Sequence, residues 1–126
     1  MSNILIIDDS KFLCAVLRDT LEKTGHRAVT VNSIIEAAKY LKTETPDLIL
    51  LDINLPGAVQ GNDACRMLKS SPSCKNVAIV LMSGAPPAEM AKKQQECGAD
   101  GFLVKPFTPP QIVEWLTTNQ ALFVRP

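Results

Sequence analysis

The sequence predicts an α/β fold in which five parallel strands form one doubly wound sheet with helices on both faces. Three runs of apolar residues, at 4–7, 48–51 and 77–82, are typical of strands buried on both faces. Two shorter runs, at 28–31 and 102–104, suit the edges of a sheet. Helical patterns separate the five runs, so we expect right-handed crossovers. The expected strand order, 2-1-3-4-5, is matched to known doubly wound sheets rather than derived.

The first two helices are expected after the strands at 4–7 and 28–31. Ser10 is a suitable N-cap for the first helix, and Gly25 is a suitable stop. Residues at helical spacing form its apolar side, namely Phe12, Leu13, Val16, Leu17 and Leu21. Asn32 or Ser33 is expected to cap the second helix. Its expected apolar face consists of Ile34, Ile35, Ala38 and Leu41.

The last three helices are indicated by start and stop signals. The third is expected to start at Asn62 or Asp63 and to break at 70–73. The fourth is expected at about 88–96, and the fifth starts at Thr108, an N-cap followed by two prolines. The core-facing positions of the fifth are Ile112, Val113 and Leu116. We expect one domain over residues 1–119 and a tail at 120–126, in which Leu122 and Phe123 suggest packing.

Composition excludes several classes of protein. The 126 residues hold 13 basic and 13 acidic side chains, so no general nucleic-acid or membrane-binding surface is expected. No apolar run reaches membrane-spanning length, and no leader precedes the first strand, so we expect a cytoplasmic protein. The four cysteines form no C-x-x-C pair and are expected to be reduced packing residues, namely Cys14, Cys65, Cys74 and Cys97.

Polar residues follow the central strands at the points where these strands end. Asp8 and Asp9 follow the first strand, Asp52 ends the third, Ser83 ends the fourth and Lys105 follows the fifth. Because the carboxyl ends of parallel strands meet at one edge, where open α/β sheets bind ligands, we expect these side chains to converge. Taken alone, Asp52 could be a strand-terminating residue, and the Asp8–Asp9 pair could serve only the helix dipole.

The chemistry of this cluster favours a cation and a phosphoryl group. Two acids after the first strand repel phosphate unless a cation intervenes. Ligands that are all oxygen suit Mg²⁺, which keeps several waters and combines one or two carboxylates with a phosphoryl oxygen. Lys105 would add a positive charge beside the phosphoryl group, and Asp52 is a candidate carboxylate nucleophile.

From these motifs the chain resembles the receiver domain of response regulators in two-component signalling, which has a flavodoxin-like fold. The resemblance spans Asn3 to about Asn119. It is carried by four segments: 4–10 (ILIIDDS), 50–56 (LLDINLP), 81–84 (LMSG) and 98–107 (GADGFLVKPF). Each segment alone is a weak signal, but the four in this order and at suitable spacing are highly specific.

The resemblance implies a phosphoacceptor and a metal site. Asp52 would accept a phosphoryl group from a sensor histidine kinase or a phosphotransfer protein. Mg²⁺ would be bound by Asp9, Asp52 and the main-chain carbonyl of Asn54, and Asp8 would contribute mainly through water. The chain would then be a regulatory module, not an enzyme, although it assists its own phosphotransfer and dephosphorylation.

The resemblance also implies a switch and an output surface. Ser83 would engage the phosphoryl group, Phe102 would reorient with it, and the Lys105–Pro106 bond would be cis. A downstream protein would bind the fourth helix, fifth strand and fifth helix, without direct contact to nucleic acid. Two alternatives stay open here: Phe102 can be plain core, and Trp115 can be either an exposed binding anchor or covered by the tail.

Two departures from the family pattern stand out. The loop after Pro56 is one residue longer than usual and lacks an acid, and Cys14 replaces a frequent basic residue. The main alternative on this fold is a phosphohydrolase with a nucleophilic aspartate. It usually places a second acid two residues after the nucleophile, where this chain has Asn54, which cannot act as a general acid. A degenerate receiver that binds partners without phosphate is disfavoured by the intact acids and Lys105.

Overall fold

The computed structural model describes residues 2–55 and 61–123, and it confirms the predicted architecture. Five parallel strands pair in the order β2-β1-β3-β4-β5. The three apolar runs form the three inner strands, because only there are both faces of a strand covered. The strands are β1 (Asn3–Ile7), β2 (Arg27–Val31), β3 (Leu48–Asp52), β4 (Ala78–Ser83) and β5 (Gly101–Val104).

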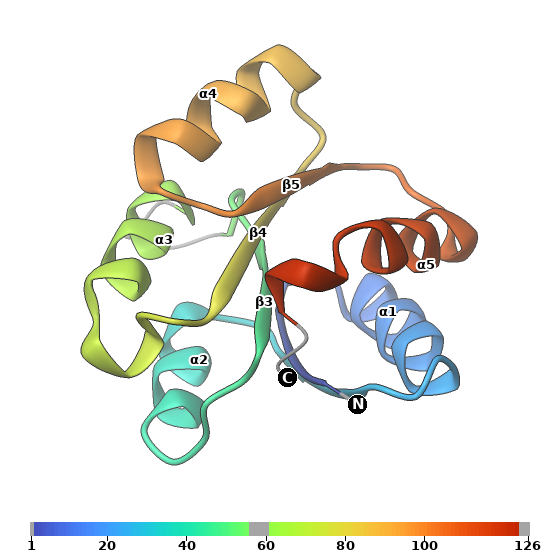
Figure 1. Ribbon diagram of the computed structural model, residues 1–126, viewed down its shortest axis with the longest axis horizontal. Helices are drawn as coiled ribbons and strands as arrows, with labels where there is room; N and C mark the ends of the chain where they lie inside the picture. Colours follow the sequence, from blue (N-terminus) through green and yellow to red (C-terminus); the bar gives the residue numbers. More distant parts are fainter. Residues whose placement is uncertain (1, 56–60, 124–126) are drawn as a thin grey trace.

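The helices cover the two faces of the sheet unequally. Figure 1 shows α1 and α5 on one side of the strands and α2, α3 and α4 on the other. The α-helices are α1 (Lys11–Lys23), α2 (Ile34–Leu41), α3 (Gly61–Ser70), α4 (Pro87–Cys97) and α5 (Pro109–Thr118). Two 3₁₀ turns, η1 (Pro72–Cys74) and η2 (Gln120–Leu122), complete the described elements. None of these helices is long and apolar enough to cross a membrane.

Alternating side chains of the inner strands build two separate cores. Odd-numbered residues of β1, such as Leu5 and Ile7, pack with α2, α3 and α4. Even-numbered residues, such as Ile4 and Ile6, pack with α1 and α5. The alternation follows from the two-residue period of a strand. The four cysteines are buried thiols within these layers, as expected.

The predicted N-caps of α1, α2 and α5 are confirmed, whereas α3 starts at Gly61, one residue before the expected Asn62. Ser10 accepts a hydrogen bond from the backbone N–H of Leu13, and Ser33, not Asn32, caps α2 by accepting from Glu36. Thr108 forms a full capping box at the start of α5. Gly98 ends α4 in the left-handed conformation with φ 77°, which favours a residue without a Cβ. These caps determine where each helix starts and stops relative to the sheet edge.

Three expected core positions are wrong, those of Phe12, Ile35 and Ala38. Phe12 is 81% exposed and Ile35 is 71% exposed. Each stands two residues before a buried residue of its helix, Cys14 in α1 and Ala37 in α2. Two residues correspond to about 200° of helical rotation, so both apolar side chains point away from the sheet. Ala38, also expected in the core, is exposed as well, and it lies about 100° round the helix from the buried Ala37.

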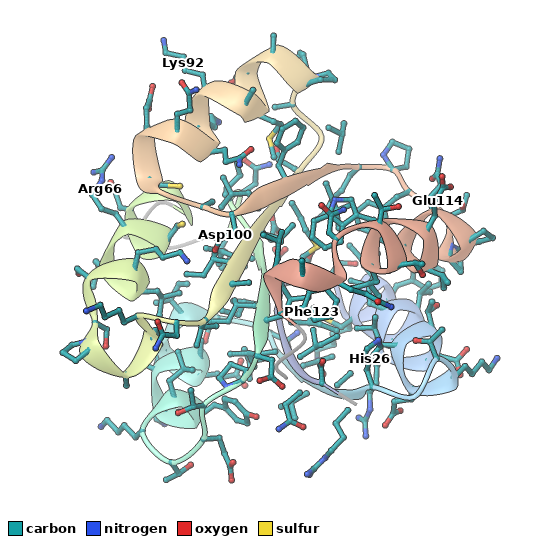
Figure 2. The ribbon with its side chains drawn as sticks, viewed as in Figure 1. His26, Arg66, Lys92, Asp100, Glu114 and Phe123 are labelled. Atoms are coloured by element: carbon teal, nitrogen blue, oxygen red, sulfur yellow. The ribbon has the colours of Figure 1, made fainter. Side chains whose placement is uncertain are left out.

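The segment after α5 returns to the body of the domain. Phe123 is 1% exposed and packs edge-on against the His26 ring, with centroids 6.1 Å apart, whereas Leu122 is 39% exposed. Figure 2 labels both partners, Phe123 beyond η2 and His26 in the turn between α1 and β2. Packing of this segment was expected. The boundary between domain and tail stays a prediction, and the expected loop departure at 56–60 lies outside the described residues.

Candidate functional site

Three carboxylates meet at the carboxyl edge of the sheet. The parallel register pairs Ile7 of β1 with Leu51 of β3, so the residues that follow, Asp8 and Asp52, are neighbours. One oxygen from each of Asp8, Asp9 and Asp52 lies within 4.8 Å of the others. The sequence-predicted convergence of the acids is therefore present in the structure.

Asp8 is the most firmly held of the three acids. Its side chain is fully buried, and one carboxylate oxygen accepts a hydrogen bond from the backbone N–H of Ser10 at 2.9 Å. The other oxygen accepts from the ammonium group of Lys105 at 2.8 Å. Both carboxylate oxygens of Asp8 are thus engaged by the protein itself.

Asp52 is buried at the end of β3, and its two oxygens differ. Oδ1 accepts a hydrogen bond from the backbone N–H of Asn54 at 2.9 Å. Oδ2 lies 3.6 Å from the Lys105 Nζ, which is too long for a good hydrogen bond. Burial raises the pKa of Asp52, and the charges of Asp8 and Asp9 add to that shift, against the opposing effects of the Asn54 bond and Lys105. A cation in the acid cluster would offset this cost.

Asp9 differs from its neighbours because it is exposed. Within the described residues, no hydrogen bond or ion pair holds its carboxylate. Its position near the other two acids is set by the backbone at the end of β1.

Ser83 and Asn54 are joined directly. The Asn54 side-chain amide donates to the Ser83 hydroxyl oxygen at 2.9 Å, and the backbone N–H of Ala85 donates to the same oxygen at 3.2 Å. Ser83 is buried and Asn54 is exposed at the rim. The structure therefore brings Ser83 to the same edge as the acids, through the ends of neighbouring strands β3 and β4.

The end of β5 places Lys105 and leaves Phe102 outside the polar cluster. The backbone N–H of Lys105 donates to the Ser83 carbonyl at 2.7 Å, and the Lys105–Pro106 peptide bond is cis, as expected. Phe102 is half-buried, lies opposite Leu81 of β4, and packs on the core that faces α2, α3 and α4.

Sequence reasoning missed a contact at this edge. The Asn32 side-chain amide donates to the backbone carbonyl of Asp8 at 2.9 Å, and the Cys14 thiol donates to the same carbonyl at 3.4 Å. From the sequence, Asn32 is a candidate only for the cap of the second helix. A usable signal existed, because Asn32 directly follows the strand at 28–31 and so belongs to the same carboxyl edge.

Comparison with known proteins identifies the family. The family model of the response regulator receiver domain matches residues 4–117. The alkaline phosphatase synthesis transcriptional regulatory protein PhoP of Bacillus subtilis is 36% identical over 110 residues, which cover 86% of this chain and 44% of PhoP. The chemotaxis protein CheY of Halobacterium salinarum is 31% identical over 111 residues, which cover 88% of this chain and 90% of CheY.

A solved structure agrees with these relatives. The signal receiver domain of a signal transduction histidine kinase from Syntrophus aciditrophicus superposes with a TM-score of 0.85 at 28% identity, covering all of this chain and 95% of that one. The chain spans about half the length of PhoP but nearly all of CheY. With the acid cluster, Lys105 and the 2-1-3-4-5 sheet, these matches show that the chain belongs to the response regulator receiver domain family of two-component signalling.

Proposed function

We propose that Asp52 is the phosphoacceptor of this receiver domain. The observation that carries the proposal is the difference between the two buried acids. Both oxygens of Asp8 accept hydrogen bonds, whereas Oδ2 of Asp52 accepts none from the described residues and lies 3.6 Å from the Lys105 ammonium. A carboxylate oxygen without a hydrogen bond can act as a nucleophile toward phosphorus, and the nearby ammonium group stabilises its negative charge.

Phosphoryl transfer to Asp52 requires few chemical groups. A carboxylate oxygen of Asp52 forms a bond to phosphorus as the bond from phosphorus to the donor's leaving group breaks. For a histidine kinase or a phosphotransfer protein, the leaving group is an imidazole nitrogen. Lys105 lies close enough to pair with a phosphoryl oxygen on Asp52. The donor brings the substrate, so the domain serves as a regulatory acceptor.

The donor set fits Mg²⁺. All ligand atoms in the cluster are oxygens, and three carboxylates face one ammonium group. Asp8 already accepts hydrogen bonds through both of its carboxylate oxygens, from Ser10 and from Lys105. We therefore propose Asp9, Asp52 and the Asn54 carbonyl as ligands, with Asp8 acting through water; the cation supplies charge neutralisation for the entering phosphoryl group.

The Ser83 hydroxyl is the proposed link from phosphorylation to shape. In the structure this hydroxyl accepts from Asn54 and Ala85, and a phosphoryl group on Asp52 would compete for it with three strong acceptor oxygens. Movement of Ser83 would free space for the half-buried Phe102, shifting the domain between two packings. Ser83→Ala should leave Asp52 phosphorylation intact while uncoupling it from partner affinity. If phosphorylation raised the partner affinity of Ser83→Ala as much as that of the wild type, the proposed switch role of Ser83 would be wrong.

The proposed output surface consists of α4, β5 and α5. Trp115 of α5 is half-buried and packs against β5, where its ring lies over Gly101. Figure 2 shows Lys92 projecting outward from α4, and its side chain is exposed. A downstream protein that binds here would meet an aromatic ring with one edge in the core, which suits a binding anchor.

Intact-mass spectrometry after incubation with acetyl phosphate tests the phosphoacceptor. We expect one added phosphoryl group with Mg²⁺ and none with a chelator. Asp52→Asn is the matched variant, since it keeps size and shape while removing the nucleophile. Persistent phosphorylation of Asp52→Asn, or phosphorylation that is insensitive to chelation, would contradict the proposal.

A further inference from the structure

We infer that Asn32 is a positioning residue for the metal site: its side-chain amide holds the peptide group that joins Asp8 to Asp9. This inference rests on the proposed Mg²⁺ site. It adds Asn32, which lies between β2 and α2, to a site whose other members lie at the ends of β1, β3, β4 and β5.

The contact is specific in its geometry. Asn32 Nδ2 lies 2.9 Å from the carbonyl oxygen of Asp8, and that oxygen belongs to the peptide bond preceding Asp9. The ladder hydrogen bond from the Asp8 N–H goes to Val31, the residue directly before Asn32. The segment at the end of β2 therefore forms two hydrogen bonds with the Asp8 backbone. The Val31 carbonyl accepts from the Asp8 N–H, and the Asn32 side chain donates to the Asp8 carbonyl.

The orientation of the Asp9 carboxylate depends on these two hydrogen bonds. The Asp8 carboxylate is held independently by Ser10 and Lys105. The Asp9 carboxylate has no such partner in the described part of the chain, so the orientation of the preceding peptide group sets where it points. Mg²⁺ demands near-ideal octahedral geometry, so a small tilt of this peptide group weakens coordination.

Asn32 is itself fixed in place. Its backbone N–H donates to Glu36 Oε2 at 2.9 Å, and Glu36 in turn donates its backbone N–H to the Ser33 hydroxyl. The capped first turn of α2 thus holds Asn32. The Cys14 thiol also donates to the Asp8 carbonyl, but a thiol is a weak donor and the distance is 3.4 Å. Cys14 keeps the carbonyl from being unpaired when Asn32 is replaced, so the expected loss is in orientation.

Mg²⁺ titration of the metal-free protein by calorimetry tests the inference without any phosphorylation readout. Asn32→Leu removes the donor at nearly constant volume, and Asn32→Ala removes it without adding apolar bulk. The matched control is Asn119→Leu, because the Asn119 amide also donates to a backbone carbonyl, that of Trp115 at 2.8 Å, away from the acids. Urea unfolding of each variant checks that the titrated protein is folded.

We expect Asn32→Leu and Asn32→Ala to bind Mg²⁺ roughly tenfold more weakly, as is typical when a partner of a metal-binding residue is removed. Asn119→Leu should bind as the wild type, and Asn32→His, which restores an N–H donor at the same chain position, should recover part of the affinity. Unchanged affinity in both Asn32 variants, or an equal loss in Asn119→Leu, overturns the positioning role. A wild-type protein that binds no Mg²⁺ overturns the proposed metal site, and this inference with it.

Discussion

Replacing Lys105 by methionine removes the ammonium group that lies against the buried acids Asp8 and Asp52 in the described part of the chain. Methionine keeps an unbranched chain of similar length, so packing changes little. Asp8, whose side chain is 0% exposed, then loses its ionic partner at 2.8 Å, and Asp52 loses a cation at 3.6 Å. The expected result is a less stable metal-free protein.

The magnitude follows from these distances. At an effective dielectric constant near 20, unit charges 2.8 and 3.6 Å apart attract by ~6 and ~5 kcal/mol before desolvation is counted. Desolvation cancels most of this, and breaking a buried pair by removing one partner costs about 3–5 kcal/mol. Because 25% of the Lys105 side chain is exposed, water screens part of the interaction. We therefore expect Lys105→Met to lose ~2–3 kcal/mol of unfolding free energy.

Urea unfolding at neutral pH in a chelating buffer measures this loss. The matched control is Lys23→Met, because Lys23 pairs with Asp19 at a similar 3.0 Å but both side chains are mostly exposed. That pair should contribute only ~0–0.5 kcal/mol. Added Mg²⁺ should shrink the loss in Lys105→Met, since the cation neutralises the same acids. Two variants that lose equal, small amounts would refute the claim that Lys105 compensates buried charge.

Three further predictions concern titration, an ion pair between elements, and the tryptophan. Burial raises the pKa of the Asp52 carboxyl above its ordinary 3.8. The folded state therefore binds the carboxyl proton more tightly than the unfolded state does. It follows that ionised Asp52 destabilises the fold. Metal-free Asp52→Asn should therefore resist urea better than the wild type at pH 7, an advantage that vanishes as the pH falls below 3.8; a less stable variant at pH 7 would contradict this sign. Lys69→Met removes the 2.5 Å ion pair between Lys69 of α3 and Asp100 at the start of β5. The variant should lose about 1–3 kcal/mol of unfolding free energy in urea and keep Asp52 phosphorylation. A smaller loss would contradict a stabilising role for this ion pair. Gly101→Ala puts a Cβ 3.2 Å from the Trp115 ring, so it should shift the tryptophan emission and cost about 1 kcal/mol, whereas an unchanged spectrum would show that the ring does not rest there.

The fold was predictable because the strands carry a strong and simple signal. Runs such as 48–51 have no polar residue, which is the pattern of a strand with helices on both faces. The caps Ser10 and Thr108 were predictable for a similar reason, since their hydrogen bonds are local and depend on a few adjacent residues.

Helix faces were predicted less well because apolar residues need not face the core. Phe12 and Ile35 match helical spacing in the sequence, but the rotation of each helix is set by its packing on the sheet. Cys14 and Ala37 take the buried positions instead, since small side chains let the helices approach the strands closely. That choice depends on tertiary distances, which a single sequence does not contain.

The acid cluster was predictable from topology, whereas the contacts around it were not. Parallel strands bring Asp8 and Asp52 together whatever the side-chain details. The bond between Asn54 and Ser83, and the bond from Asn32 to the Asp8 carbonyl, depend on rotamers and loop geometry. Their residue types suggested polar roles, but their partners required the three-dimensional structure.

The most direct test of the account is to find which side chain carries the phosphoryl group. Borohydride reduces an aspartyl phosphate to homoserine, so peptide mapping after treatment with acetyl phosphate, Mg²⁺ and then borohydride marks the acceptor. Because Oδ2 of Asp52 alone combines burial with freedom from a hydrogen bond in the described part of the site, we predict homoserine at position 52 only. Homoserine at position 8 or 9, or an unmarked Asp52 in phosphorylated protein, would contradict the account.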